Sequence, residues 1–84
     1  MEAIAALTEA IKLKPDYAIA YNGRGYAHHL AHDYKNAIAD YDQAIRLNSS
    51  YLNAIKNRAN ARRSLGDTAG ANADRAKADS LEGK

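Results

Sequence analysis

The chain has 84 residues, and a core of this size supplies little stability unless its helices are regular or it associates with another chain. It contains no Cys, which excludes disulfides and thiolate metal sites, and its formal net charge of +2 is too small to indicate nucleic-acid binding. Ala, the strongest helix former, is the commonest residue, whereas Val, Phe and Trp, which favour strands, do not occur. This composition predicts an all-α protein.

The sequence repeats itself with a fixed period of 34 residues, which is the separation of Ala3 from Ala37. Small and apolar residues recur at helical spacing when the chain is shifted by that length, as stacked units require, because each copy buries the same face against its neighbour. The matching pairs include Ala3/Ala37, Ile4/Ile38, Ala10/Ala44, Tyr17/Tyr51, Ala20/Ala54, Ala27/Ala61, Ala37/Ala71 and Ala44/Ala78.

Five helices are predicted from this pattern and from the residues that start and stop helices. The first ends before Pro15, because the residue preceding a proline is disfavoured in helical geometry. Asp16, Asp33 and Asp67 are the expected N-caps of the second, third and fifth helices, and Gly66 is expected to end the fourth in a left-handed conformation. The predicted helices cover residues 2–14, 18–31, 34–47, 52–65 and 68–81.

Three segments in the middle of the chain resemble a tetratricopeptide repeat, a family whose characteristic period matches the one found here. They are residues 20–27 (AYNGRGYA), 33–38 (DYKNAI) and 40–47 (DYDQAIRL). Tyr21 stands where the family usually has Trp, and Ser49 stands where it usually has Pro, so the turn at Ser49 departs from the family pattern.

The resemblance implies a single all-α domain over residues 1–84, built from antiparallel helical hairpins that stack as a right-handed α-solenoid. Its expected division is a half repeat at 1–17, a full repeat at 18–51 and a degenerate repeat at 52–84 that ends in a capping helix. The family's small residues allow helices to cross closely. The positions expected at these crossings are Gly25, Ala37 and Ala44.

Two charged residues recur together. Arg24 and Asp40 reappear one period later as Arg58 and Asp74, and each Arg is followed by its Asp at the same separation. This repetition predicts an ion pair between the two helices of each unit. Pairing of Arg58 with Asp40 across units is one alternative, and separately solvated charges are the other.

A polar stripe lies on one face of the fourth predicted helix, because its members are three or four positions apart. In tetratricopeptide arrays the first helix of each repeat lines a concave groove, and the resemblance places this stripe there. The stripe consists of Asn53, Lys56, Asn57, Asn60, Arg63 and Ser64. The corresponding positions of the second helix form a more apolar set, which consists of Ile19, Asn22, Gly23, Tyr26, His29 and Leu30.

Amide and cationic donors beside an apolar ledge suit a protein or peptide that has an acidic or carboxylate end and an apolar anchor. Lys56 with Asn60 resembles part of the carboxylate clamp of chaperone-binding members. The function expected from the resemblance is therefore a non-catalytic scaffold for protein–protein interaction that binds a peptide in its groove, with neither nucleic acid nor membrane as a partner.

The two terminal helices differ. The last carries polar residues where the third carries apolar ones, which predicts a solvated cap. The first presents an apolar face, formed by Ile4, Leu7 and Ile11, whose partner helix in the family pattern is missing. This face predicts self-association as a homodimer, and a fragment of a longer array is the alternative. The alternative to a peptide-binding groove is a structural self-association module, or a fragment of a longer array, with no ligand in the groove. The polar positions of the last helix are Asn72, Arg75 and Asp79.

The sequence offers little catalytic chemistry. It contains no nucleophile motif, no phosphate-binding loop and no paired-carboxylate motif, so we expect no enzymatic activity and no cofactor. His28 and His32 have the spacing of two zinc ligands but lack an evident third, so we expect no metal site. The first residues lack the basic segment of a signal peptide, which favours a cytoplasmic location.

Overall fold

The computed structural model describes residues 2–83, so Met1 and Lys84, the outer bounds of the predicted domain, lie outside the described residues. The described part of the chain forms five α-helices and no strand. This result confirms the predicted all-α class, and every helix boundary lies within one residue of its predicted position. The helices are α1 (Glu2–Leu13), α2 (Ala18–Leu30), α3 (Tyr34–Leu47), α4 (Leu52–Leu65) and α5 (Thr68–Glu82).

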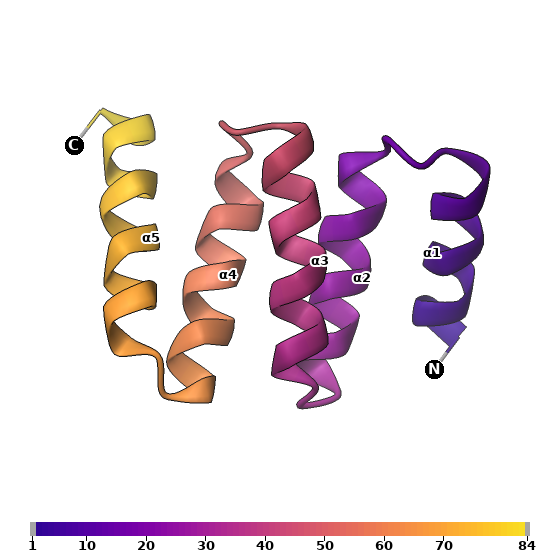
Figure 1. Cartoon of the computed structure of the whole chain (residues 1–84), viewed down its shortest axis with the longest axis horizontal. Coiled ribbons are helices and arrows are strands. Elements are labelled where there is room, and N and C mark those ends of the chain that lie inside the picture. The colour runs from indigo at the N-terminus through magenta and orange to yellow at the C-terminus, as the bar shows by residue number, and fades with distance from the viewer. Residues whose placement is uncertain (1, 84) are drawn as a thin grey trace.

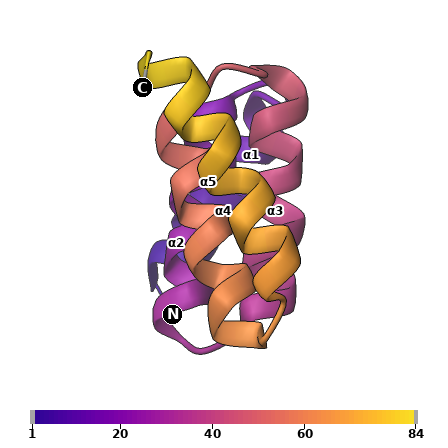
Figure 2. The same cartoon turned by 90° about the vertical axis from the view of Figure 1, so that its left-hand side faces the viewer.

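The helices stand side by side in chain order, with α1 and α5 at opposite ends of the stack (Figure 1). Each helix packs against its neighbours in sequence, and α2 also contacts α4. Seen from the α5 end, α2 and α4 lie on one side of the stack and α3 lies on the other (Figure 2). The chain is thus a stack of antiparallel helical hairpins in which α2 and α4 share one face.

The turns follow the sequence signals only in part. Gly66 ends α4 with a φ of 94°, and the Asp67 side chain accepts a hydrogen bond from the backbone N–H of Gly70 at 2.9 Å, as predicted. The predicted cap at Asp16 is wrong, because α2 begins at Ala18 and its N-cap position is Tyr17, which makes no side-chain cap. Asp33 does precede α3, but its carboxylate accepts from the Asn36 side chain at 2.7 Å instead of capping the backbone.

The close crossing of α2 and α3 is built on a glycine. A Cβ atom at Gly25 would lie 2.7 Å from Cε1 and 2.9 Å from Cδ1 of Tyr41, and 3.1 Å from the carbonyl oxygen of Ala37. Tyr41, Ala37 and Ala44 are all fully buried, which confirms the predicted small residues at the crossings. Because protein interiors are close-packed, a side chain at position 25 would have to displace the Tyr41 ring.

Buried ion pairs join the two helices of each hairpin. Arg24 donates to Asp40 from Nε at 2.8 Å and from Nη2 at 2.7 Å, and Arg58 donates to Asp74 in the same two-pronged way at 3.0 and 2.7 Å. The predicted pairing within each unit is confirmed. The alternative of Arg58 with Asp40 is wrong, although Arg58 does reach the preceding unit through Asp42 at 2.8 Å.

The carboxylates of both ion pairs are buried between the helices. Asp40 and Asp74 are 5% and 3% exposed, so each carboxylate needs its guanidinium partner. The hydrogen bond to Asp40 raises the pKa of Arg24, and the hydrogen bond to Asp74 raises the pKa of Arg58. Arg62 adds a further donor to Asp74 at 3.0 Å, so the second carboxylate is held by two guanidinium groups.

The two helical glycines of α2 should respond oppositely to substitution. Gly25→Ala and Gly25→Leu should lower the free energy of unfolding, the larger side chain by about 3 kcal/mol, because each overpacks the Tyr41 ring. Gly23→Ala should be neutral or raise stability by about 0.5–1 kcal/mol, since its Cβ meets only the Leu7 methyl groups at 3.4 Å and alanine favours the helix. Thermal and urea unfolding of the variants measures both effects. Equal stability of the Gly25 and Gly23 variants would contradict the packing described here.

The buried pairs should also show coupling that an exposed pair lacks. A double-mutant cycle on Arg24 and Asp40 with alanine replacements should give a coupling of about 1.5–3 kcal/mol, because both hydrogen bonds are charge-assisted and shielded from water. The control is the exposed Glu9–Lys12 pair of α1, at 3.3 Å, for which we expect a coupling near zero. Chemical denaturation of the variants in each cycle supplies the values, and similar couplings for the two pairs would show that burial adds nothing.

Candidate functional site

The structure brings the predicted groove residues onto the shared face of α2 and α4, here called the α2–α4 face. On α2 this face carries Ile19, Asn22, Tyr26, His29 and Leu30. On α4 it carries Asn53, Lys56, Asn57, Asn60 and Arg63. The two helices contact each other, and Asn22 of the first set is hydrogen-bonded to Asn57 of the second.

The α2 side of this face is an exposed apolar ledge. Ile19, Tyr26 and Leu30 are 61%, 52% and 59% exposed, which is unusual for three large side chains on one helix. His29 is half-buried, and its ring stands edge-on to Tyr34 of α3 with the ring centroids 5.2 Å apart. The ledge therefore offers apolar area to a ligand, and His29 borders it from a packed position.

Two of the predicted amides hold the helices together. Asn57 on α4 donates from Nδ2 to the Oδ1 of Asn22 on α2 at 3.1 Å, and Asn22 donates to the Tyr51 hydroxyl at 3.4 Å. Both Asn side chains are half-buried. These two hydrogen bonds fix the relative position of α2 and α4. They leave only the remaining amide groups of Asn22 and Asn57 for a ligand.

The two cationic side chains of the face, Lys56 and Arg63, differ in whether they already have a partner. Lys56 donates from Nζ to Glu82 of α5 at 3.1 Å, so a carboxylate of the protein already holds it. Arg63 is exposed, and no hydrogen bond or ion pair to its guanidinium is found among residues 2–83. Asn53 and Asn60 are exposed beside these two residues. Arg63 is thus the cation best able to meet an incoming carboxylate without breaking a bond.

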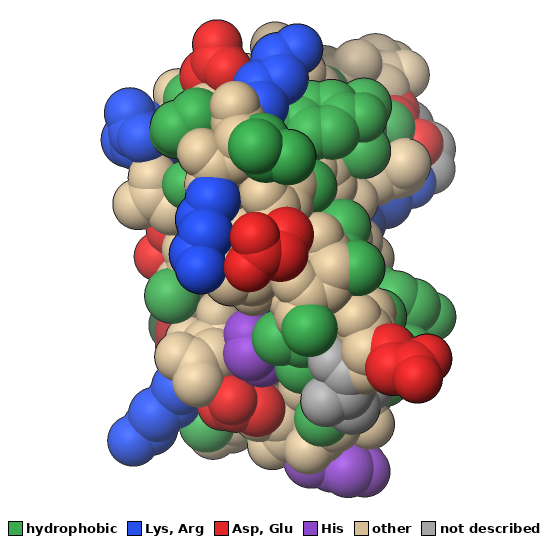
Figure 3. Space-filling view, turned by 90° about the vertical axis from the view of Figure 1, so that its right-hand side faces the viewer, with side chains coloured by type: hydrophobic (Ala, Val, Ile, Leu, Met, Phe, Trp, Pro, Cys, Tyr) green, Lys and Arg blue, Asp and Glu red, His purple; other side chains and the backbone are tan. Residues whose placement is uncertain are grey.

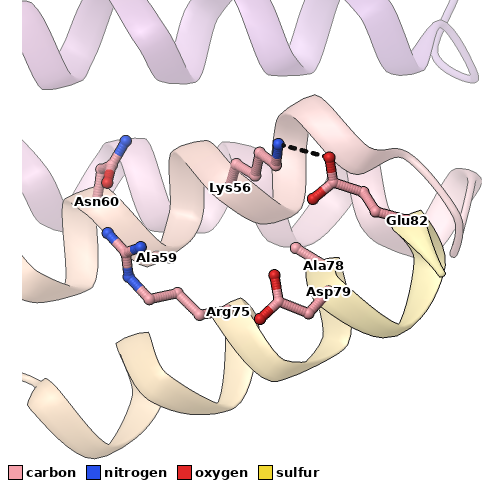
Figure 4. Close-up of a pocket in the computed structure, with 7 residues that line it drawn as sticks. All are labelled: Lys56, Ala59, Asn60, Arg75, Ala78, Asp79 and Glu82. Atoms are coloured by element: carbon pink, nitrogen blue, oxygen red, sulfur yellow. Dashed lines mark hydrogen bonds and ion pairs between the residues drawn. The ribbon is translucent and has the colours of Figure 1, made fainter. Parts of the chain in front are cut away.

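A surface pocket of about 350 Å³ lies between α4 and α5 next to Lys56 (Figure 4). The Asp79 side chain points into it, and the Arg75 guanidinium extends toward Asn60 (Figure 4). Sequence reasoning missed this pocket and the Lys56–Glu82 bond, because the period maps Glu82 onto the uncharged Asn48 and gives no pairing signal. The lining residues are Lys56, Ala59, Asn60, Arg75, Ala78, Asp79 and Glu82.

This pocket is the terminal counterpart of a filled position in the interior. Of the seven residues one period before its lining, all but Asn48 lie on α2 and α3. They include the buried Gly25, Tyr41 and Ala44, and Tyr41 belongs to the same core cluster as Ala61 of α4. At the end of the stack, Arg75 replaces Tyr41 and Asp79 replaces Ile45. The outer side of α5 is accordingly polar, with Asn72, Arg75 and Asp79 all exposed.

The histidines have partners other than a metal. Nδ1 of His28 lies 3.4 Å from Asp33 and its Nε2 lies 3.6 Å from Asp40, while His32 Nδ1 lies 2.8 Å from the Tyr34 hydroxyl. Residues 2–83 contain no group of three or more potential ligands arranged to hold a metal ion. Within the same residues, no helix is long and apolar enough to span a bilayer.

The α1 face predicted for self-association lies partly against α2. The two terminal carbons of Leu7 would be 3.4 Å from a Cβ atom at Gly23, so Leu7 packs on the backbone of α2. Ile4 and Ile11 are, like Leu7, half-buried. The role of these three residues in self-association stays a prediction.

Comparison with known proteins identifies the fold. Models of the tetratricopeptide repeat match residues 18–51 and residues 1–31. The second tetratricopeptide domain of Spaghetti (RPAP3), solved bound to the HSP90 peptide SRMEEVD, is 31% identical with a TM-score of 0.90 over 93% of this chain and 72% of that chain. The chain belongs to the tetratricopeptide repeat family. It is therefore a protein–protein interaction module of that family.

Other solved structures are similar over nearly the whole chain. The first tetratricopeptide domain of Spaghetti (RPAP3), bound to the same peptide, is 26% identical with a TM-score of 0.93 over 96% of this chain. The crystal structure of MamA is 28% identical with a TM-score of 0.90 over 94% of this chain. The chain spans 64% of the first structure and 46% of the second. No curated protein sequence matches the chain.

Proposed function

We propose that the α2–α4 face binds a protein segment or peptide that has an acidic or carboxylate end and an apolar side chain near it. The observation that carries this proposal is the adjacency of the exposed apolar ledge on α2 to the exposed donors of α4, with Arg63 uncommitted among the described residues. Support comes from the two similar Spaghetti domains, which were solved with a peptide that ends in acidic residues.

The two halves of the face serve different parts of such a ligand. A carboxylate of the ligand accepts charge-assisted hydrogen bonds from Arg63 and Asn60. Lys56 becomes a third donor once its bond to Glu82 is broken. An apolar side chain of the ligand covers part of Ile19, Tyr26 or Leu30 and removes their exposed area from water. Since the donors are exposed and few, we expect binding in the micromolar range or weaker.

Glu82 competes with the ligand in this arrangement. Its carboxylate occupies the Lys56 ammonium at 3.1 Å, which is where a carboxylate of the ligand would bind. The Lys56 and Glu82 side chains are 48% and 23% exposed, so their bond is weakened by water and salt and can be exchanged. The Glu82 contact therefore lowers the affinity of the face for acidic ligands.

The groove assignment is tested with the peptide SRMEEVD as a probe. Calorimetric titration should show weaker binding by Arg63→Ala and Lys56→Ala, about threefold to tenfold each, because each variant removes one charged donor. Lys77→Ala, which removes an exposed cation from α5 outside this face, is the matched control and should bind as the parent does. Binding should also weaken as salt is added. Unchanged affinity of both groove variants for every acidic peptide tested would exclude this face.

Removal of the competing carboxylate should have the opposite effect. We expect Glu82→Gln to strengthen binding of the same peptide by about twofold to fivefold, since it releases Lys56 without disturbing the groove. Glu9→Gln is the matched control, because it removes one negative charge from another exposed ion pair at the far end of the stack. The same titration measures both. If the two variants gain equally, the change reflects net charge alone and the proposed competition does not occur.

The division of the chain into units at 1–17, 18–51 and 52–84 forms part of this proposal, because it makes α2 and α4 the first helices of successive repeats. Self-association through α1 is a separate proposal. It uses residues of α1 that do not belong to the α2–α4 face, so the two are independent of each other.

A further inference from the structure

The pocket between α4 and α5, here called the α4–α5 pocket, contains an acid without a partner. Its four charged side chains are Lys56, Arg75, Asp79 and Glu82. Lys56 and Glu82 bind each other at 3.1 Å, so their charges balance. No hydrogen bond or ion pair to the Asp79 carboxylate is found among residues 2–83. This carboxylate is exposed and points into the pocket, so it offers a negative charge to a ligand there (Figure 4).

The nearest cation on the same helix does not neutralise this acid. Arg75 lies one helical turn before Asp79 on α5, a spacing at which the two side chains could pair. Its side chain extends instead toward Asn60 on α4, away from Asp79 (Figure 4). The cation of Arg75 therefore lies beside the α2–α4 face, and the anion of Asp79 lies inside the pocket.

The floor of the α4–α5 pocket is apolar. Ala59 of α4 and Ala78 of α5 line it and are 1% and 3% exposed. A methylene chain that lies over these two alanines is removed from water, while a cation at its tip can pair with Asp79. Lys and Arg are the side chains that combine a long apolar stem with a cationic tip. The pocket, with a volume of about 350 Å³, therefore fits one basic side chain.

The same pocket adjoins the α2–α4 face, because Lys56 and Asn60 belong to both. Arg63 follows Lys56 by two turns of the same helix, so the two lie about 10 Å apart along its axis. An extended peptide covers this distance in about three residues. A bound segment whose carboxylate meets Arg63 can thus place a side chain about three residues away in the pocket.

We propose that the α4–α5 pocket receives a Lys or Arg side chain of the segment bound on the α2–α4 face, with the cation paired to Asp79. This inference rests on the proposed function, because the segment must lie on that face. The partner is a protein segment of mixed charge, in which a basic residue lies about three positions from the acid that meets Arg63. A purely acidic segment would face Asp79 with a charge of its own sign, so the pocket discriminates against it.

Comparison with the interior of the stack shows that an apolar occupant does not fit. One period before Arg75 and Asp79 stand the apolar Tyr41 and Ile45, and Tyr41 shares a core cluster with Ala61 of α4. A helix that packed on the α4–α5 pocket in the same way would bury the Asp79 carboxylate against an apolar surface. An occupant that brings a cation avoids this cost.

Two peptides that differ in one side chain test the pocket. SRMEEVD carries its Arg two and three positions before its two Glu residues, and SQMEEVD replaces this Arg by Gln. In calorimetric titration the parent chain should bind SRMEEVD more tightly, and Asp79→Asn should weaken this binding about threefold to fivefold, because the ion pair is partly exposed. Asp79→Asn should bind SQMEEVD at least as tightly as the parent does, since it removes an acid near an acidic ligand.

Asp16→Asn is the matched control, because it removes the same charge from the exposed turn between α1 and α2. That end of the stack has a different surface, on which hydrophobic side chains are exposed in several places between isolated charged groups (Figure 3). The control should change the affinities for the two peptides equally. In NMR titrations of the parent chain, the methyl signals of Ala59 and Ala78 should shift more with SRMEEVD than with SQMEEVD, which reports directly on the pocket floor.

Equal affinity of the parent chain for the two peptides, or an effect of Asp79→Asn that is the same for both, would overturn the pocket assignment. The groove is judged separately, since Arg63→Ala should weaken binding of both peptides. If both bind equally and both lose affinity in Arg63→Ala, the pocket is wrong and the groove stands. If neither Arg63→Ala nor Lys56→Ala changes either affinity, the groove assignment is wrong. Absence of binding by both peptides would refute the two proposals together.

Discussion

The structure depends on how closely α2 and α3 can approach each other. Gly25 leaves the space that the Tyr41 ring fills, and Ala37 and Ala44 on the same helix as Tyr41 are fully buried. The buried surface beneath α4 includes this same ring, so the position of α4 follows from the crossing of α2 and α3. The α2–α4 face exists because that crossing sets the distance between its two helices.

The repeat separates interior positions from surface positions. Small buried residues recur with the period, as do the Arg and Asp of the buried pairs, because each unit must pack and neutralise its charges in the same way. The outward residues of α2 and α4 have no such constraint, so one helix is apolar on its exposed side and the next is polar. The α2–α4 face is therefore apolar on α2 and polar on α4, although the two helices belong to similar units.

The sequence predicted the features that recur with the period and some of those that neighbouring residues determine. The helices, the Gly66 and Asp67 caps and the pairing of Arg24 with Asp40 all follow from the period or from neighbouring residues. The caps at Asp16 and Asp33 failed because each depends on the path of one turn. At Asp33 the side chain of Asn36 takes the carboxylate, which the hydrogen bond also keeps at a lowered pKa.

The candidate site was predicted less completely than the fold. Helical spacing decides the direction of a side chain, so it predicted which residues share one side of α2 and one side of α4. Their bonds were not predicted, because the Asn57–Asn22 and Lys56–Glu82 contacts join residues 35 and 26 positions apart that no repeat relates. Such contacts depend on side-chain rotamers between packed helices, and composition carries no signal for them.

Arg58 has a consequence for how the stack comes apart. It holds Asp74 within its own hairpin and Asp42 on the hairpin before it, so one guanidinium belongs to two units at once. If either hairpin opens alone, this side chain loses some of its partners while remaining partly buried. Fraying of one unit is therefore penalised by its neighbour, and the two hairpins are expected to unfold in a single cooperative transition.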